Sequence, residues 1–549
     1  MRRVLPAVLA IACVGLAVAN LRVHFPNRDV SWLLYLGQHL ADGARLNVDL
    51  FEIDPPFVVW LTTAVARLAG ALHAAPIAVY DVCVALLLVA STALTARLAR
   101  LSAWGAAVLT VALWLLPGGD FGQREHLMVA LMCPYAGVLV RRIEDDAPPS
   151  WQAVVAGVLA GLGICFKPHF AVVWAGMELA AWRDGLRWCR RAEFLAVAAV
   201  QLGYALAIVP SLPAYLAVVR EYGPAYQTFW HVPPWALVLF EPSSFLVVAA
   251  LGLAAINYRA VPAGRRACVR IFAALTAASW VVAIVQAKGW PYHFYPPSAF
   301  ALVLLFSTAA GERGSGVTTA VAGGLALGLA IGAAVGPVVD EAVRLTEPSP
   351  GTRLVAAVRR ASRPGERIVV FNFGMQAAFP TIPLAGLESA SRWPTQWMLM
   401  AAYPVPQPWH APDTMPGFER SYFESTVADL TARPPELLVA PIPDPGAPTL
   451  RGFDFLGYFA QDERFARVLA RYDLATTASG HRILRRRDAP WRPESLPADL
   501  GGTFDDVSAG SDPPTRSRPW QLVLVALVVA STGGIAWRDR QSYRTAPTD

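Results

Sequence analysis

The sequence predicts a polytopic α-helical membrane protein with a smaller α/β domain near its C-terminus, and its composition supports this fold class. Hydrophobic residues make up 55% of the 549 residues and charged residues only 16%, whereas soluble proteins contain roughly 25% charged residues. Long apolar runs recur through most of the first 340 residues. A soluble enzyme, a disordered scaffold and a nucleic-acid-binding protein are therefore poor fits. The net charge of +6 needs an explanation other than nucleic acid.

The apolar runs predict about 12 membrane spans, because a helix needs about 20 apolar residues to cross a bilayer. We expect these spans at 4–21, 76–96, 102–117, 126–140, 151–166, 169–182, 193–218, 234–256, 270–287, 294–310, 316–338 and 520–537. One further apolar stretch, at 55–72, either forms a thirteenth span or lies flat on the membrane surface.

The distribution of basic residues decides between these two arrangements, since Lys and Arg accumulate in short cytoplasmic loops. With the N-terminus inside and 55–72 flat, 18 basic residues fall on the cytoplasmic side and eight in the short outer loops. If 55–72 spanned the membrane, this bias would reverse. We therefore expect 55–72 to be an interfacial helix. The first run, after Arg2-Arg3, also resembles a cleavable secretory signal, but we favour a retained span.

The predicted spans divide the chain into three parts. Residues 1–340 form a transmembrane module whose first outer loop covers 22–75. Residues 341–518 form a soluble domain on the outer, periplasmic side. Residues 519–549 hold the last span and a cytoplasmic tail.

The soluble domain has the sequence pattern of an α/β fold. Its expected elements are strands at 367–373, 436–440 and 481–484, helical stretches near 352–361 and 461–471, and a Pro-rich loop at 403–416. No Gly-rich phosphate-binding motif opens any of its helices, so we interpret it as a binding or supporting domain. None of the six cysteines lies in it, so it must fold by its own core without disulfides.

The first outer loop is rich in acidic residues: Asp29, Asp42, Asp49, Glu52 and Asp54. Asp29 opens an amphipathic segment in which apolar residues recur at helical spacing. An aspartate at this position is typical of a helix N-cap. It is equally suited to act as a general base at the membrane surface, and the residue alone does not separate the two interpretations.

A second outer loop concentrates charged residues in a short space. It runs from Gly118 to His126 and contains Asp120, Arg124 and Glu125 after two glycines. Either acid is a candidate cap for the following helix. We favour a functional site, because Arg124 lies on the side of the membrane that is otherwise poor in basic residues.

The two lysines fall on the same outer face. Of the 46 basic residues only Lys167 and Lys288 are lysines, and each has a histidine nearby, His169 and His293. Lysines at helix ends often extend toward the membrane surface, but arginine serves that purpose equally well. Lysine provides a compact positive charge that suits a phosphate. Together with Arg124 they indicate a site for a lipid-linked phosphate.

Common hydrolase and ATPase motifs are missing from the sequence. It contains no Walker loop, HExxH pair, GxSxG elbow or CxxC pair, which argues against ATP hydrolysis, zinc proteolysis and serine hydrolysis.

The layout resembles the GT-C glycosyltransferases. The resemblance rests on a first span, a long outer loop that opens with an acid, the segment Asp49-Leu-Phe-Glu-Ile-Asp-Pro-Pro56 and a flat second helix. A further segment, Gln286-Ala-Lys-Gly-Trp-Pro-Tyr-His-Phe-Tyr-Pro296, is similar to a stretch of bacterial members. The protein O-mannosyltransferases and lipid A aminoarabinose transferases are the most similar group. The latter carry Lys before the Pro-Pro pair, where this chain has Asp54.

The resemblance implies roles for individual residues. Asp29 matches the family's catalytic acid, which deprotonates the acceptor hydroxyl. Asp120 or Glu125 matches the second-loop acid, and we favour Glu125. The residues expected to bind the donor phosphate are Arg124, Lys167, His169, Lys288, Tyr292 and His293, and the further loop acids, on the acceptor side, are Asp49, Glu52, Asp54 and Asp120.

Some members of this group use a divalent metal and others do not. Asp29, Glu52 and Glu125 are candidate ligands for Mg²⁺ or Mn²⁺, although no spacing in the sequence requires a metal.

The resemblance implies an inverting hexosyl- or pentosyltransferase in the bacterial inner membrane, with its active site on the periplasmic face. Its expected partners are membrane lipids, a polyprenyl-phosphate-linked sugar donor, and a glycan, lipid or protein acceptor of the cell envelope. A glycan polymerase or ligase that uses lipid-linked oligosaccharides is the alternative. A 12-span transporter or flippase is less well supported, because nearly all charges lie at helix ends and no internal repeat is visible.

Overall fold

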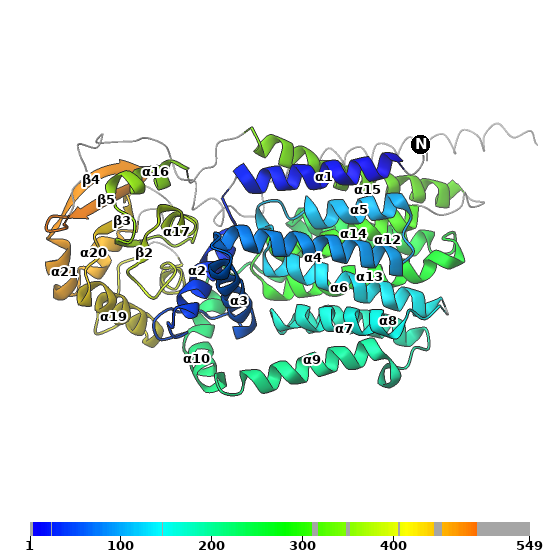
Figure 1. The fold of residues 1–549 in the computed structure, drawn as a ribbon, viewed down its shortest axis with the longest axis horizontal. Helices are drawn as coiled ribbons and strands as arrows, with labels where there is room; N and C mark the ends of the chain where they lie inside the picture. Colours follow the sequence, from blue (N-terminus) through cyan, green and yellow to red (C-terminus); the bar gives the residue numbers. More distant parts are fainter. Residues whose placement is uncertain are drawn as a thin grey trace, which may run out of the picture.

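The computed structural model describes residues 4–23, 25–144, 146–309, 317–346, 352–404, 407–443 and 453–490. It consists of a long helix bundle with an α/β domain at one end (Figure 1). The expected last span at 520–537 and the tail to 549 lie outside the described residues.

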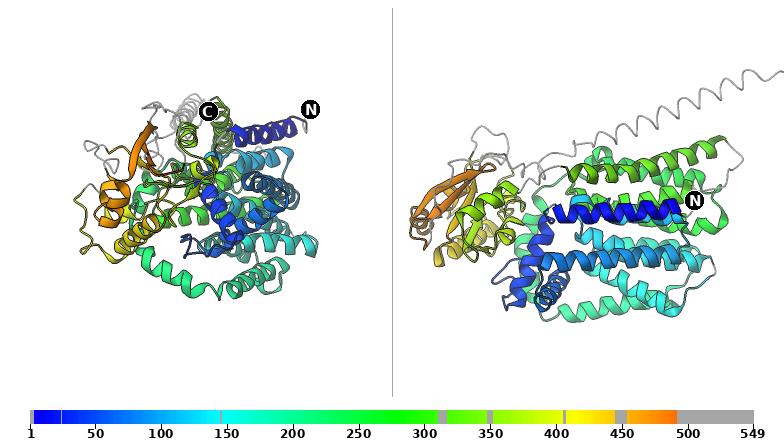
Figure 2. Two further views of the ribbon diagram at one scale, coloured as in Figure 1. Left: turned by 60° about the vertical axis from the view of Figure 1, so that its left-hand side comes forward. Right: turned by 45° about the horizontal axis from the view of Figure 1, so that its top comes forward.

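Helices occur at the other eleven expected spans. These are α1 (Val4–Val23), α4 (Pro76–Leu98), α5 (Ala103–Trp114), α6 (Arg124–Ile143), α7 (Ser150–Cys165), α8 (Phe170–Arg183), α9 (Ala192–Ile208), the pair α11 (Pro234–Phe240) and α12 (Pro242–Asn257), α13 (Ala263–Gln286), α14 (Pro291–Ala309) and α15 (Val317–Arg344). They run side by side in both views of Figure 2.

The lengths of these helices show a multi-pass membrane protein. Within the described residues, six helices are long and apolar enough to cross a bilayer, or seven if α11 and α12, which are bent by 72°, form one broken span. Others, such as α5 and α7, are apolar but shorter. The total of about twelve spans therefore stays a prediction.

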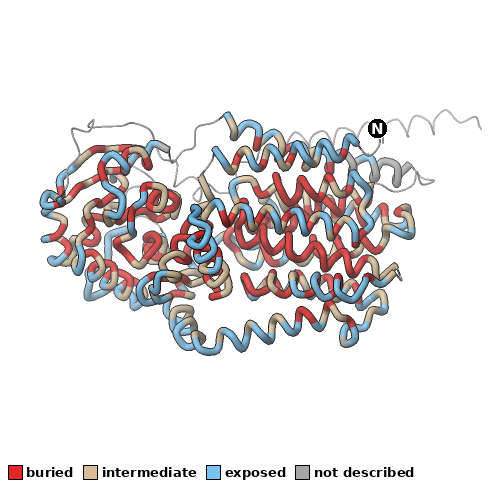
Figure 3. Tube along the Cα trace, in the orientation of Figure 1, coloured by how far each residue is buried: buried red, intermediate tan, exposed pale blue. Residues whose placement is uncertain are grey.

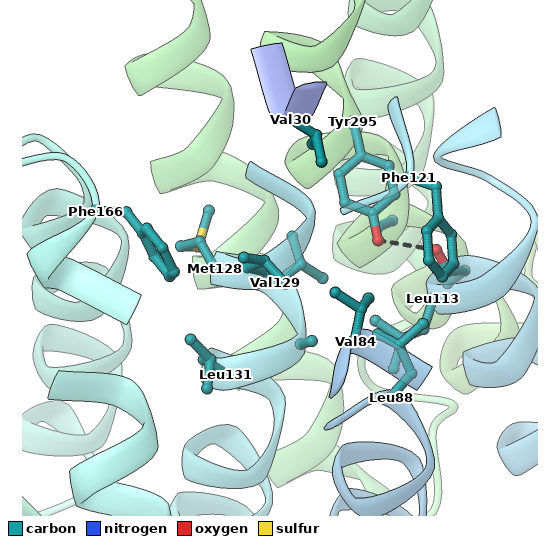
Figure 4. Close-up of a cluster of buried hydrophobic side chains, with 14 of the residues drawn as sticks. Val30, Val84, Leu88, Leu113, Phe121, Met128, Val129, Leu131, Phe166 and Tyr295 are labelled. Carbon is teal, nitrogen blue, oxygen red and sulfur yellow. Dashed lines mark hydrogen bonds between the residues drawn. The ribbon is translucent and has the colours of Figure 1, made fainter. Parts of the chain in front are cut away.

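The bundle packs around α6 and α14, whose residues are almost all buried. Figure 4 shows part of this core, in which three residues of α6 pack near side chains of neighbouring elements: Met128, Val129 and Leu131 with Val84, Leu88, Leu113 and Phe166. By contrast α9 exposes large apolar side chains such as Leu195, Leu202 and Leu206 along the edge of the bundle (Figure 3). An apolar exposed face of this kind suits contact with lipid.

Two helices lie across one end of the bundle rather than along it (Figure 1). They are α2 (Arg28–Ala41) and α3 (Pro56–Ala71). They pack closely, because a Cβ added at Gly37 would lie only 2.5 Å from the carbonyl carbon of Thr62, so only glycine fits at that position. The crosswise direction of α3 is the geometry expected of the interfacial helix at 55–72.

The α/β domain is built on a five-stranded mixed sheet with the strand order β2-β1-β3-β5-β4. The strands are β1 (Arg367–Val370), β2 (Glu388–Ser389), β3 (Leu437–Pro441), β4 (Tyr472–Ala478) and β5 (His481–Arg486). β1 is parallel to β2 and β3, and β5 is antiparallel to β3 and β4. The helices are α16 (Thr352–Ala361), α17 (Thr381–Ala385), α18 (Leu399–Ala402), α19 (Gly417–Ala432), α20 (Phe455–Phe459) and α21 (Glu463–Leu469).

The three expected strands correspond to β1, β3 and β5, and the two expected helical stretches to α16 and α21. The sequence patterns missed the strands β2 and β4 and the helices α17, α18, α19 and α20. β4 reads Tyr-Asp-Leu-Ala-Thr-Thr-Ala, and the irregular pairing between Leu474 and Thr476 interrupts the alternation by which strands are recognised. The domain's own core is rich in aromatic residues, including Phe371, Tyr422 and Phe459.

The remaining described helix, α10 (Leu212–Thr228), leaves the end of α9 and runs toward the α/β domain (Figure 1). It packs against α18 and α19 of that domain. The bundle and the α/β domain are therefore joined by contacts as well as by the chain.

The orientation of α3 makes a testable prediction about topology. Residue 73 follows α3, and residue 187 follows α8 at the opposite end of the bundle. Both residues are exposed. We expect a cysteine at His73 to react with a membrane-impermeant maleimide on intact cells, and a cysteine at Arg187 to react only after permeabilisation. Labelling of His73→Cys only after permeabilisation would show that 55–72 crosses the membrane.

Candidate active site

Asp29 lies in the first turn of α2, but it is not the residue that caps this helix. The side chain of Asn27 accepts hydrogen bonds from the backbone N–H groups of Asp29 and Val30. The Asp29 carboxylate points to the bundle instead, where Oδ2 accepts hydrogen bonds from Nε2 of Gln123 at 2.7 Å and from Nη2 of Arg124 at 3.0 Å. The interpretation of Asp29 as a helix cap is therefore wrong, and its carboxylate is available for another role.

Arg124 joins two acids of the first outer loop to the start of α6. Its guanidinium forms ion pairs with Asp29 and with Asp54, and the residue is only 6% exposed. A buried guanidinium is costly unless carboxylates compensate its charge. Two acids distant from Arg124 in sequence are thereby held at the end of the bundle.

Electrostatics favour an ionised Asp29. Burial raises its pKa, but the guanidinium groups of Arg124 and Arg28 and the hydrogen bond from Gln123 outweigh that effect, so the pKa lies below its ordinary value. An ionised carboxylate can accept a proton.

Glu52 differs from Asp29, because burial raises its pKa above the ordinary value. Its Oε2 accepts a hydrogen bond from Nε1 of Trp32 at 2.7 Å, and its Oε1 accepts one from the backbone N–H of Asp54 at 2.9 Å. Glu52 therefore ties α2 to the segment that carries Asp54 and helps to hold Asp54 beside Arg124.

A second charged pair lies next to Arg124. Oε1 of Glu125 accepts a hydrogen bond from Nζ of Lys167 at 2.5 Å, and both residues are buried. Nε2 of His293 lies 3.9 Å from the same oxygen, and Nζ of Lys167 lies 5.5 Å from the centre of the Tyr292 ring. Glu125 is therefore no helix cap, since Gln123 caps α6. Lys167 and His293, two residues expected at the donor phosphate, lie beside Glu125, and Tyr292 lies beside Lys167.

Several buried polar atoms of this cluster have no hydrogen-bond partner in the described part of the chain. They are Nε of Arg124, Oε2 of Glu125, Nε2 of His169 and both ring nitrogens of His293. Buried polar groups almost always find a partner. A concentration of unpaired donors and acceptors beside two cations is typical of a site that binds a polar ligand.

Lys288 does not join this cluster. Its ammonium group donates to the backbone carbonyls of Tyr226, Gln227 and Phe229 at 2.6, 3.2 and 2.5 Å, which uses all three of its donors. It also lies 5.9 Å from the centre of the Trp290 ring. Because these carbonyls occupy its ammonium group, we no longer place Lys288 among the phosphate-binding residues. Its role in the structure is to hold the end of α10.

Two of the predicted loop acids also lie apart from the cluster. Asp49 pairs with Arg45 at 3.2 Å on the surface, where its side chain is 44% exposed. Asp120 accepts a hydrogen bond from Nδ2 of Asn27 at 3.0 Å, so it braces the turn before α2. Neither contact brings its carboxylate to Arg124.

A metal does not fit the site well. Among the residues that the structure describes, no group of three His, Cys, Asp or Glu side chains is placed to hold a metal ion. The candidate ligands Asp29, Glu52 and Glu125 each direct an oxygen to a cation or N–H donor instead. We therefore derive no step through Mg²⁺ or Mn²⁺.

Sequence reasoning missed the neutral partners of the carboxylates. Gln123 and Trp32 hold Asp29 and Glu52, and Asn27 caps α2. The position of Asn27 directly before α2 was a usable signal, since Asn is a favoured N-cap residue. No comparable local sequence pattern indicated the contacts that Gln123 and Trp32 make.

The sequence predicted an apolar helix bundle, one flat helix at 55–72 and an α/β domain, and the structure adds α2 as a second helix across the same end of the bundle. No family model and no curated protein matches the chain. Among solved structures it is similar to the crystal structure of ArnT from Cupriavidus metallidurans in the apo state, with a TM-score of 0.52, 13% identity, and coverage of 88% of this chain and 98% of that chain. At this low identity the likeness shows the fold alone: the chain has an overall fold similar to that of ArnT.

The pair formed by Lys167 and Glu125 yields a prediction about stability. Replacement of Lys167 by Met leaves a buried carboxylate without its cation, which costs about 3–5 kcal/mol for a buried pair. We expect Lys167→Met to lower the thermal midpoint in detergent. The double variant Lys167→Met/Glu125→Gln should recover most of the loss. A double variant no more stable than Lys167→Met would show that the pair does not contribute in this way.

Proposed function

We propose that the protein is an inverting membrane glycosyltransferase that moves a sugar from a polyprenyl-phosphate donor to an acceptor of the cell envelope. One observation carries this proposal: a half-buried Asp29, whose pKa is held below its ordinary value, lies beside Arg124 at the end of an apolar bundle, next to a cluster with unpaired polar atoms. The fold likeness to ArnT supports the same class of enzyme.

Asp29 acts as the general base in this proposal. The acceptor hydroxyl transfers its proton to the carboxylate of Asp29 while its oxygen forms a bond to the anomeric carbon of the sugar. The bond between that carbon and the phosphate oxygen breaks, and the polyprenyl phosphate leaves with the electron pair. Attack from the face opposite the phosphate inverts the anomeric configuration.

Arg124 and Lys167 stabilise the leaving phosphate. Both are buried cations, and cations aimed at a developing charge in a site that excludes water contribute strongly to catalysis. Nε of Arg124 has no partner in the described structure, so the guanidinium can bind a phosphate oxygen without giving up both carboxylates. Tyr292, His293 and His169 surround Lys167 and complete the proposed phosphate site.

Glu125 has two roles in the proposal, one for each oxygen. Oε1 holds Lys167, and the buried, unpaired Oε2 accepts a hydrogen bond from a substrate hydroxyl. The acidic segment of the first loop supports the site from the acceptor side through Glu52 and Asp54.

The direction of approach follows from the architecture. The site lies where α2 and the start of α6 meet at the end of the bundle that carries the α/β domain (Figure 1). A lipid-linked donor enters from the bilayer with its phosphate at that level. We place this end on the periplasmic face of the bacterial inner membrane. The sugar, a hexose or pentose, and the acceptor, a glycan, lipid or protein, remain open.

The test compares cells that carry the wild type, Asp29→Asn or Asp42→Asn. Asp42 is a matched control, because it is an exposed acid at the other end of α2. Loss of a general base lowers rates by roughly 10²–10⁴-fold. We therefore expect mass spectrometry to find one sugar missing from the surface glycans or glycolipids of Asp29→Asn cells, with its polyprenyl-phosphate donor accumulating.

Equal amounts of protein in the membranes must be shown by immunoblot. Normal glycans in Asp29→Asn cells at equal expression would contradict the proposal. Loss of long glycan chains, with lipid-linked oligosaccharides accumulating instead of a monosaccharide donor, would identify the polymerase or ligase alternative.

A further inference from the structure

The α/β domain contacts the helix that carries Asp29. The ring of Phe379 packs edge-on against Trp32 at 4.9 Å, and the backbone N–H of Ser389 donates to the hydroxyl of Tyr35 at 2.8 Å. Both Trp32 and Tyr35 belong to α2. This domain is therefore part of the environment of the candidate base.

One of these contacts reaches the residue next to Asp29. Nη1 of Arg28 donates to Oε1 of Gln376 at 2.5 Å, and Nε of the same guanidinium lies 3.9 Å from Oδ1 of Asp29. Gln376 and Arg28 are 348 residues apart in sequence. The amide of Gln376 thus holds one side of the Arg28 guanidinium while another side faces the carboxylate.

Arg28 and Arg124 lie beside different carboxylate oxygens of Asp29. Oδ2 accepts hydrogen bonds from Gln123 and Arg124, and Oδ1 faces Arg28. In the proposed reaction Arg124 also binds the donor phosphate, which weakens its hold on Asp29. Arg28 then remains as a cation beside the other oxygen of the base.

The backbone around Gln376 is held by local hydrogen bonds and by the buried side chain of Phe379. This segment follows β1, and the backbone N–H groups of Ala378 and Phe379 both donate to the carbonyl of Met375. Phe379 itself is fully buried against α2. With the backbone held in this way, the hydrogen bond from Arg28 to the Gln376 amide oxygen restricts the rotamers available to Arg28.

We propose that Gln376 is a positioning residue of the transferase: through Arg28 it holds a positive charge beside Oδ1 of Asp29 and so keeps the base ionised. This inference rests on the proposed function. It assigns the α/β domain a direct part in catalysis, beyond support of the fold.

Other charged groups also act on Asp29, and the test must separate Gln376 from them. The groups that interact with Asp29 from the surrounding elements are Arg28, Arg124, Gln123, Lys167, Glu52, Tyr226 and Tyr292, and Asp54 and Glu125 share its cations Arg124 and Lys167. Arg124 and Lys167 lower the pKa of Asp29 as Arg28 does. Their contributions stay in place when only Gln376 is changed.

The sign of the expected effect follows from the charges. Removal of the Gln376 side chain takes away the hydrogen bond that holds the Arg28 guanidinium in its place near Oδ1. Movement of a positive charge away from a carboxyl group raises the pKa of that group. A close opposite charge lowers a carboxyl pKa by about 1–3 units, so partial loss of one of two arginines should raise the pKa of Asp29 by about 0.5–1 unit. The acid limb of the pH–rate profile should move up by the same amount.

The experiment titrates Asp29 directly in the full-length protein in lipid nanodiscs, without substrate. The infrared band of its protonated carboxyl group is identified as the band that Asp29→Asn removes. We expect its midpoint to rise in Gln376→Ala and in Arg28→Gln, and to stay at the wild-type value in Gln461→Ala. Gln461 is a matched control, since its amide donates to the carbonyl of Tyr458 within the α/β domain.

The double variant Arg28→Gln/Gln376→Ala decides the mechanism. If Gln376 acts through Arg28, the double variant titrates like Arg28→Gln. An unshifted midpoint in Gln376→Ala overturns the inference, and so does a further shift of the double variant beyond Arg28→Gln. If Gln376→Ala does not fold, Gln376→Met, which keeps the length of the side chain and removes the amide that binds Arg28, takes its place in both comparisons. An unshifted midpoint in Gln376→Met, or in Arg28→Gln, overturns the inference.

The outcome is separable from the test of the proposed function. Asp29→Asn cells with normal glycans contradict the transferase, whatever the titration shows. Loss of transfer in Asp29→Asn together with an unshifted Gln376→Ala contradicts only the role of Gln376.

Discussion

The buried guanidinium of Arg124 is the feature on which the rest of the site depends. It lies at the first position of α6, the most buried of the long apolar helices, and pairs with Asp29 and Asp54 of the first outer loop. A cation this far from water needs carboxylates to compensate it. That requirement draws α2 and the segment before α3 onto the end of the bundle and brings a candidate base next to a candidate phosphate site.

The α/β domain and the first loop then stabilise one another. The rings of Phe51, Trp393 of the domain and Tyr222 of α10 contact one another, and the backbone N–H of Phe51 donates to the carbonyl of Arg392. Lys288 adds a third connection, because it fixes the last carbonyls of α10. The reacting groups of the proposed enzyme are therefore held by three parts of the chain that are distant in sequence, which favours a preorganised site.

The fold could be predicted largely from the sequence, because a bilayer imposes long apolar helices and an asymmetric distribution of arginine. The charged residues of the candidate site could be proposed from the sequence, because Arg124 breaks that asymmetry and Lys167 is one of only two lysines. The neutral side chains that bind these charged residues could not be predicted. Gln123 and Gln376 are ordinary polar residues until the chain brings them to Asp29 and Arg28. For Lys288 the sequence predicted the position but not the partners. The backbone carbonyls that bind it belong to the end of α10, about 60 residues earlier in the chain, and the sequence does not reveal the direction of that helix.

The most direct test of this account is a cryo-EM structure of the full-length protein in lipid nanodiscs with a bound polyprenyl phosphate. The account predicts phosphate density within hydrogen-bond distance of Arg124 and Lys167, with the carboxylate of Asp29 facing the space where the acceptor binds. Phosphate density elsewhere, with the Arg124–Asp29 and Lys167–Glu125 pairs unchanged, would contradict it and show that these charges serve only to hold the fold.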